Sequence, residues 1–163
     1  MLQGSRQAEH AYTELLAVMK GVCANYVGDA RELWRRLVFH HLITNVDDHL
    51  QNIGFLYMGG NQWQLSPAFD VNPIPDNDRE SKTWSSEDTG PITSMAQLMG
   101  QALQFALTAE QSMAVVHQVV EAVGQWRAVG QSADVGMTAL ELNEFKLAFE
   151  HSGLADAKKL VGL

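Results

Sequence analysis

The sequence predicts a mainly helical α+β fold, in which one β-hairpin is inserted behind the second helix. Apolar residues recur at three- and four-residue steps before residue 44 and again after residue 93, the spacing of buried helix faces. Between these regions, IGFLYM and QWQLS are rich in aromatic and branched residues and flank GGN, whose glycines tolerate the positive φ of a tight hairpin. With 163 residues, 46% of them apolar, the chain fits a single domain over residues 1–163 with its own core.

Two helices are predicted ahead of the hairpin. The first runs from about Ser5 to Ala24, because its apolar residues keep to one face. The second follows Asp29 and Glu32, an acidic analogue of a capping box, and ends near Thr44. The stretch NVDDHLQN is therefore predicted to be the loop that leaves a buried helix.

Behind the hairpin, Asn72–Pro91 contains three of the four prolines and is predicted to be a long irregular loop. The pattern then returns to helices. One of them is capped by Thr108 with Gln111, and the last by Thr138 with Glu141. The stretch HSGL is expected to end that last helix.

Composition excludes several classes of protein. The net charge of −8, with lysines and arginines scattered along the chain, argues against direct binding of nucleic acid. No apolar run reaches the roughly 18 residues of a membrane helix and the N-terminus lacks a signal pattern, so a soluble, cytoplasmic chain is expected. The single cysteine, Cys23, excludes an internal disulfide and a Cys-rich zinc site, and its helical spacing predicts a buried structural thiol.

The stretch NVDDHLQN, residues 45–52, places carboxylates between two apolar segments, where lost hydration is usually offset by partners, a metal or catalytic use. Asp47 and Asn52 stand five residues apart, the spacing of the catalytic Asp and the metal-binding Asn in the protein-kinase loop. In phosphoryl transfer, a carboxylate accepts or orients the proton of the attacking hydroxyl, and an amide oxygen holds Mg²⁺. Asp70 can bring a second carboxylate to the same metal, because a tight hairpin returns the chain close to where it left. We therefore expect Asp47, Asn52 and Asp70 to meet in one cleft.

The same region resembles a known family. The pattern N-x-D-D-H-x-x-N-x-x-F-L, followed by W-x-L-S-P-A-F-D-V, resembles the C-terminal domain of the HipA-like serine/threonine kinases, the toxin components of bacterial toxin–antitoxin modules. The resemblance extends from about Tyr12 through the final helices, and its diagnostic part is Asn45 to Pro73. It implies a protein-kinase-like C-terminal lobe.

The resemblance also implies roles for individual residues. Asp47 would be the catalytic base, Asn52 a Mg²⁺ ligand and Asp70 the second Mg²⁺ ligand. His49, two residues after the base, would be a catalytic residue that either orients the loop or stabilises charge. Gln51 departs from the family, which usually has a basic residue just before the asparagine, and this weakens the case for a phosphate contact.

The resemblance further implies cofactors and partners. The nucleotide-gripping lysine and the phosphate-covering loop of an N-terminal lobe are not found in the sequence, so we expect an isolated lobe that does not transfer phosphate alone. Mg²⁺ and ATP are the implied cofactors, with ATP held together with the missing lobe by residues that stay unknown. The implied partners are a protein substrate, an antitoxin or a separate N-terminal lobe, and self-association is a further expectation. The alternative function is a non-catalytic module that works by binding.

Two simpler interpretations remain open. Asp47 and Asp48 can be turn formers after a helix, since Asp side chains bond their own backbone. Asp48 is expected to be structural, whereas the order of Asp47, Asn52 and Asp70 favours the kinase interpretation. His40 and His41 with these aspartates suggest a metal-hydrolase cluster, but adjacent helical residues point about 100° apart, so core or interface positions are expected instead.

Overall fold

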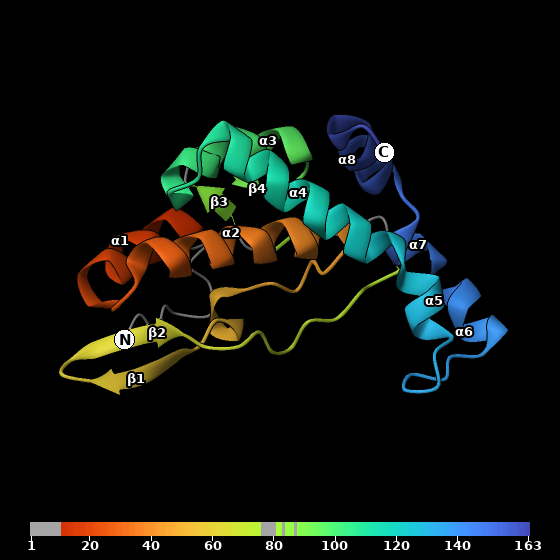
Figure 1. The fold of residues 1–163 in the computed structure, drawn as a ribbon, viewed down its shortest axis with the longest axis horizontal. Coiled ribbons are helices and arrows are strands. Elements are labelled where there is room, and N and C mark those ends of the chain that lie inside the picture. Colours follow the sequence, from red (N-terminus) through yellow and green to blue (C-terminus); the bar gives the residue numbers. More distant parts are fainter. Residues whose placement is uncertain (1–10, 76–80, 83, 87) are drawn as a thin grey trace.

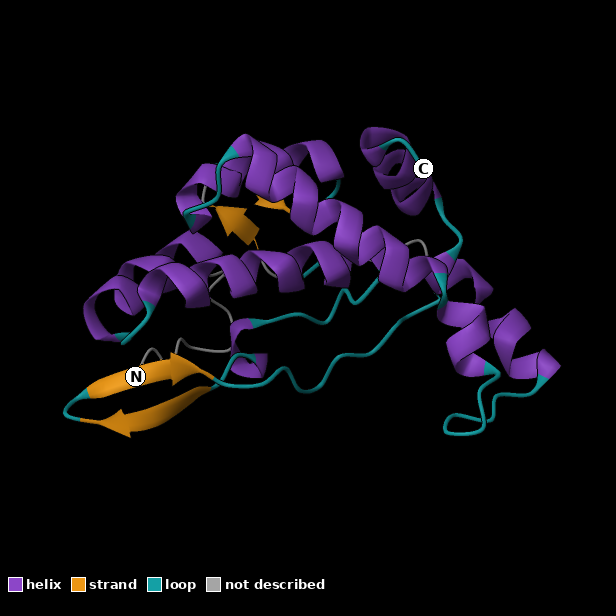
Figure 2. Ribbon diagram, in the orientation of Figure 1, coloured by secondary structure: helices purple, strands orange, loops and turns teal. Residues whose placement is uncertain are grey.

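The computed structural model describes residues 11–75, 81–82, 84–86 and 88–163 and is mainly helical, as the sequence predicts (Figures 1 and 2). The helices, including two short 3₁₀ helices (η), are α1 (Tyr12–Val22), α2 (Tyr26–Leu42), η1 (Leu50–Asn52), α3 (Met95–Gln101), η2 (Ala102–Phe105), α4 (Ala109–Gly124), α5 (Trp126–Gly130), α6 (Ala139–Glu144), α7 (Lys146–Phe149) and α8 (Ser152–Val161). None of the helices in the described part of the chain is long and apolar enough to span a membrane.

Helix α2 lies at the centre of the described fold, because α1, α3, α4 and α8 all pack against it (Figure 1). Its apolar face is fully buried, and the indole N–H of Trp34 donates to the Leu98 carbonyl at 3.1 Å. Tyr12 on α1 is also buried, and its hydroxyl donates to the Asp48 carbonyl at 2.8 Å. The core therefore supports α2 and the loop that follows it.

The start of α2 differs from the prediction. Its N-cap is Asn25, whose side chain accepts a hydrogen bond from the Gly28 N–H, so the helix begins three residues before Asp29. Asp29 lies inside the helix and is buried. The predicted start of α1 at Ser5 lies outside the described residues, and Cys23, which caps the end of α1, is half-buried rather than buried.

The predicted hairpin is confirmed. Strands β1 (Phe55–Gly59) and β2 (Gln62–Leu65) pair antiparallel, with Phe55 opposite Leu65. The turn residues have positive φ, and the Ala24 N–H donates to the Trp63 carbonyl at 2.9 Å, which ties the hairpin to the α1–α2 connection.

The prediction of a single hairpin is wrong. A second antiparallel pair, β3 (Trp84–Ser86) and β4 (Gly90–Pro91), lies within the segment predicted to be irregular. Trp84 also forms a bridge with Ala11, so it has the strand partner that the sequence did not reveal. Strands of three and two residues are too short to show an alternating pattern, and side-chain contacts stabilise them: the Gln97 amide donates to the Pro91 carbonyl at 2.9 Å.

The C-terminal helices bear out both predicted caps, and α5, α7 and α8 are helices that the sequence did not predict separately. Thr108 and Thr138 each form a full capping box, at the starts of α4 and α6. The helix that begins at Thr138 ends early and is followed by the short α7. HSGL does not close the last helix, because α8 starts at Ser152 and buries Leu154 against the core.

Candidate active site

The stretch NVDDHLQN leaves the end of α2 as a tightly supported loop. Thr44 adopts a left-handed backbone conformation with φ of 52°, and the Asn45 N–H donates to the His40 carbonyl at 2.9 Å. Asn45 is 3% exposed, and the buried Tyr12 hydroxyl holds the Asp48 carbonyl from the other side. The backbone of the loop is therefore held by hydrogen bonds at several points.

Asp47 and Asn52 lie together on this loop. The Asn52 amide nitrogen donates to the Asp47 carbonyl at 3.1 Å. The amide oxygen of Asn52 accepts no hydrogen bond from the described part of the chain. The turn of η1 between them is closed by the Asn52 N–H, which donates to the His49 carbonyl at 2.9 Å. The Asp47 side chain is 44% exposed. A carboxylate and an amide side chain thus lie close together on this loop.

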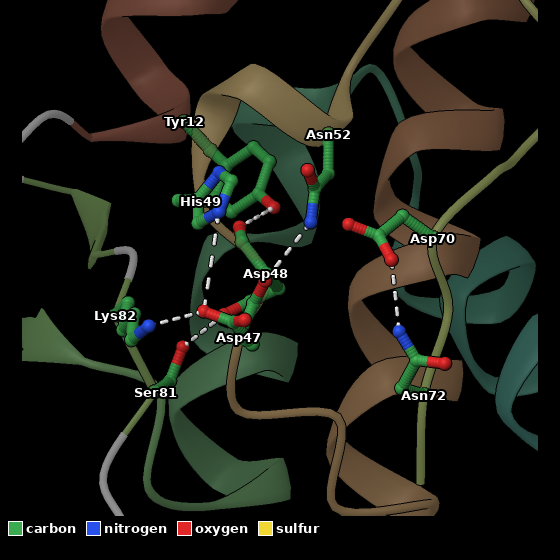
Figure 3. A network of polar contacts seen from close by, with 9 residues as sticks. All are labelled: Tyr12, Asp47, Asp48, His49, Asn52, Asp70, Asn72, Ser81 and Lys82. Carbon is green, nitrogen blue, oxygen red and sulfur yellow. Dashed lines mark hydrogen bonds and ion pairs between the residues drawn. The ribbon is translucent and has the colours of Figure 1, made fainter.

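The hairpin returns the chain to this loop. The Ser66 N–H donates to the Gly54 carbonyl at 2.9 Å. A Cβ at Gly54 would lie 2.8 Å from Ser66 Oγ and 3.0 Å from Phe69 Cε1, so only glycine leaves room for this close approach. Asp70, which follows Phe69, lies opposite Asn52 in Figure 3.

The structure therefore brings Asp47, Asn52 and Asp70 together, although the first and last come from opposite sides of the hairpin (Figure 3). They line an open surface rather than an enclosed pocket, since Asp70 is exposed. Asp70 has a left-handed backbone with φ of 53°, a conformation that is uncommon for residues other than glycine and is often found at functional sites. The Asn72 amide donates to Asp70 Oδ1 at 2.9 Å and leaves the other oxygen turned toward Asn52.

The donor set suits Mg²⁺. Mg²⁺ prefers hard oxygen ligands, keeps several waters and usually takes only one or two carboxylates plus substrate phosphates. The Asn52 amide oxygen and the free Asp70 oxygen are ligands of that kind. Among the residues that the structure describes, no three His, Cys, Asp or Glu side chains are grouped to hold a metal.

His49 lies beside Asp47. Its Nε2 is 3.9 Å from Asp47 Oδ1, and its Nδ1 is buried without a hydrogen-bond partner in the described part of the chain. The ring also stands at the N-cap of η1, the turn that leads to Asn52. Its place agrees with either of the expected roles, orienting the loop or stabilising charge.

Asp48, the neighbour of Asp47, points into the protein. It is 3% exposed and accepts a hydrogen bond from the Ser81 hydroxyl at 2.6 Å. Burial raises the pKa of its carboxyl to about 6 despite that hydrogen bond. The expected structural role agrees with this position.

Sequence reasoning missed Ser81 and Lys82, which lie against the loop in Figure 3. The Lys82 N–H donates to the Val46 carbonyl at 3.0 Å, and its ammonium forms an ion pair with Asp47. No motif signals either residue, because they come from the polar segment predicted to be irregular. Only the fold places these two residues on the loop.

A hollow of 510 Å³ lies behind the loop, on the side of Asp48. His40 and His41 line it together with His151 of the α8 N-cap. Burial lowers the pKa of both His40 and His41 to about 4, with a further contribution from Arg36 and His151 respectively, so both rings are neutral at pH 7. The expected core position is confirmed for His40, which is 6% exposed.

Comparison with known proteins identifies the family. Residues 1–127 match the model of a protein family, the HipA-like C-terminal domain. The chain belongs to the HipA-like C-terminal domain family. The mainly helical fold with two small hairpins is thus a kinase-like lobe, and the resemblance seen in the sequence is confirmed.

A curated relative of this HipA-like chain points the same way. A Haemophilus influenzae protein named "Putative kinase" is 34% identical over 55 residues. The aligned part covers 32% of this chain and 16% of that relative. The chain therefore matches only a small part of the relative's length.

Proposed function

We propose that the chain is the catalytic and magnesium-binding lobe of a HipA-like protein serine/threonine kinase, which transfers a phosphoryl group from ATP to a Ser or Thr hydroxyl of a protein substrate. The observation that carries this proposal is the meeting of Asp47, Asn52 and Asp70 on one open surface (Figure 3). Membership of the HipA-like family supports it.

Each residue has a task under this proposal. The exposed Asp47 carboxylate accepts or orients the proton of the attacking hydroxyl, and its loop is held by buried contacts so that the carboxylate is positioned before substrate arrives. The Asn52 amide oxygen and the free Asp70 oxygen hold Mg²⁺. Bound there, the metal would neutralise charge on the phosphates. His49, whose Nε2 lies 3.9 Å from Asp47 Oδ1, orients the loop or stabilises charge beside the base.

The nucleotide needs further contacts, because positioning supplies most of the catalysis in this reaction class. We propose that a second lobe provides them and that it covers the β1–β2 hairpin. Leu56, Tyr57 and Met58 on β1 are 50%, 60% and 56% exposed, an unusual run of apolar side chains on a solvated strand. The same run favours the second candidate function, a binding module that pairs with an antitoxin or a separate lobe without catalysis.

Metal binding tests the proposal directly. Mn²⁺, which replaces Mg²⁺ at oxygen sites, is titrated into the chain and followed by electron paramagnetic resonance. We expect one site that is lost in Asp70→Asn, weakened in Asn52→Ala and unchanged in Asp134→Asn, an exposed carboxylate between α5 and α6 that serves as control. Absence of any site in the wild-type chain would overturn the proposal.

Catalysis separates the two candidate functions. The chain is incubated with labelled ATP and a Ser/Thr peptide mixture, alone and with a supplied nucleotide-binding lobe. We expect transfer only in the presence of that lobe and none with Asp47→Asn. Metal binding without transfer in either condition would favour the binding module.

A further inference from the structure

The loop that holds the proposed base carries charge of one sign. Residues 45–52 contain two aspartates and neither lysine nor arginine, and Asp70 adds a third carboxylate beside them (Figure 3). The phosphoryl group of the proposed reaction is itself an anion. Sites of this class stabilise developing negative charge with lysine or arginine as well as with the metal. Positive charge must therefore reach this surface from another segment.

Lys82 supplies such a charge. Its ammonium contacts Asp47 Oδ1 across 35 residues of sequence. The ion pair places a cation at the proposed base, and Asn52 lies on the other side of Asp47 in the view of Figure 3.

The backbone of Lys82 is held in place while its side chain stays solvated. The Lys82 N–H donates to the Val46 carbonyl at 3.0 Å, and the preceding Ser81 hydroxyl donates to Asp48 at 2.6 Å. The Lys82 and Asp47 side chains are 62% and 44% exposed, and solvent screens an ion pair of that kind, so it contributes little to folding stability. An anchored backbone with a long, weakly held side chain lets the ammonium exchange one anionic partner for another without moving the loop.

We propose that Lys82 is the phosphate-binding cation of this site, an inference that rests on the proposed function. In the structure the ammonium lies on Asp47. When a metal-bound polyphosphate occupies the surface beside Asn52 and Asp70, the ammonium binds a phosphoryl oxygen in place of the Asp47 carboxylate. Lysine suits this exchange, because it binds phosphate as a compact point charge on a flexible stem.

The test uses Mn²⁺ and inorganic tripolyphosphate as probes, so that it does not depend on turnover. Affinity for Mn²⁺ is measured first by electron paramagnetic resonance, and affinity for tripolyphosphate is then measured calorimetrically at saturating Mn²⁺. For Lys82→Met we expect undiminished Mn²⁺ affinity and a loss of about tenfold in tripolyphosphate affinity, the scale of one hydrogen bond to a charged group. Lys82→Arg should retain most of the affinity.

Two further variants distinguish a direct phosphate contact from an effect of net charge. Lys146→Met removes one positive charge from the exposed start of α7, so it reports the effect of net charge alone and should change nothing. Gln51→Lys, at an exposed position next to Asn52, should restore binding in the Lys82→Met background, since it places a cation beside the proposed metal ligand Asn52.

The outcomes distinguish the two proposals. If the wild-type chain does not bind Mn²⁺, the proposed function fails and this inference falls with it. If Mn²⁺ binds but tripolyphosphate affinity is the same in Lys82→Met, or falls equally in Lys146→Met, only the role of Lys82 is refuted.

Discussion

At the scale of single residues, the loop after α2 contains two adjacent aspartates with opposite surroundings. Asp47 faces solvent, whereas Asp48 is 3% exposed and accepts a hydrogen bond from Ser81. Sequence proximity therefore says little about chemistry here, because one peptide unit separates a proposed base from a structural carboxyl. Burial distinguishes them, and it acts by penalising the charged form of Asp48.

This burial makes folding stability depend on pH. The pKa of Asp48 is raised from 3.8 to about 6. The contribution of this carboxyl to the free energy of unfolding is therefore fully present below pH 3.8 and is lost as the pH rises through 6. Asp48→Asn stays neutral and can still accept a hydrogen bond from Ser81. We therefore expect its stability relative to wild type to increase as the pH rises from 3.8 to 6 and to stay higher above that pH. The gain at pH 7.5 is on the order of 2–3 kcal/mol, from about 1.36 kcal/mol for each pKa unit.

Urea unfolding at pH 4 and pH 7.5, followed by tryptophan fluorescence, measures the difference between Asp48→Asn and wild type. Asp134→Asn serves as the exposed control. An equal difference at both pH values would mean that the carboxyl of Asp48 does not titrate in this way.

At the scale of elements, two capping boxes of the same type start one helix in the core and one at the surface. Thr108 and Thr138 each accept from the backbone N–H three residues on, and the Gln or Glu there bonds back to the cap. Helix α4 packs against α2 and α8 in the core, whereas α6 has six residues and buries little beyond Leu142. The same motif should therefore matter differently for the whole fold.

We expect Thr108→Ala to lower the free energy of unfolding by about 1 kcal/mol, the usual value of an N-cap. Thr138→Ala should have less effect on global unfolding, because α6 can open locally while the core stays intact. Chemical denaturation measures the first effect. Hydrogen exchange measures the second, as faster exchange confined to residues 139–144. Equal losses of global stability in both variants would show that α6 unfolds together with the core.

At the scale of the whole molecule, the β1–β2 hairpin projects from the helices (Figure 1). Its apolar residues Leu56 and Met58 are 50% and 56% exposed, and they lie two positions apart on one face of the strand. An exposed apolar face of this kind usually marks an interaction site.

We therefore expect the chain to self-associate at high concentration, and the double variant Leu56→Glu with Met58→Glu to remain monomeric. Light scattering over a concentration series measures this. The matched control is Leu140→Glu with Leu147→Glu, which changes two exposed leucines at the other end of the described fold. Strictly monomeric wild-type chain at every concentration would contradict the expectation.

Much of the fold could be predicted from local patterns. The buried faces of α1, α2 and α4, the turn of the first hairpin and both capping boxes depend on contacts within a few residues, which sequence periodicity and residue chemistry reveal. Elements of two to five residues, such as β3, β4 and α5, were missed because they are too short to show a period. Helix α8 was missed because HSGL suits the end of one helix as well as the approach to the next.

The sequence by itself identified the residues of the proposed site, because the spacing of Asp47 and Asn52 and the hairpin before Asp70 are local features. The structure brings all three residues together (Figure 3). Tertiary structure alone decided what surrounds them. It buried Asp48 and placed Lys82 on Asp47 across 35 residues. The physical reason is that charge pairing and desolvation depend on distances between segments, and those distances exist only once the core has folded.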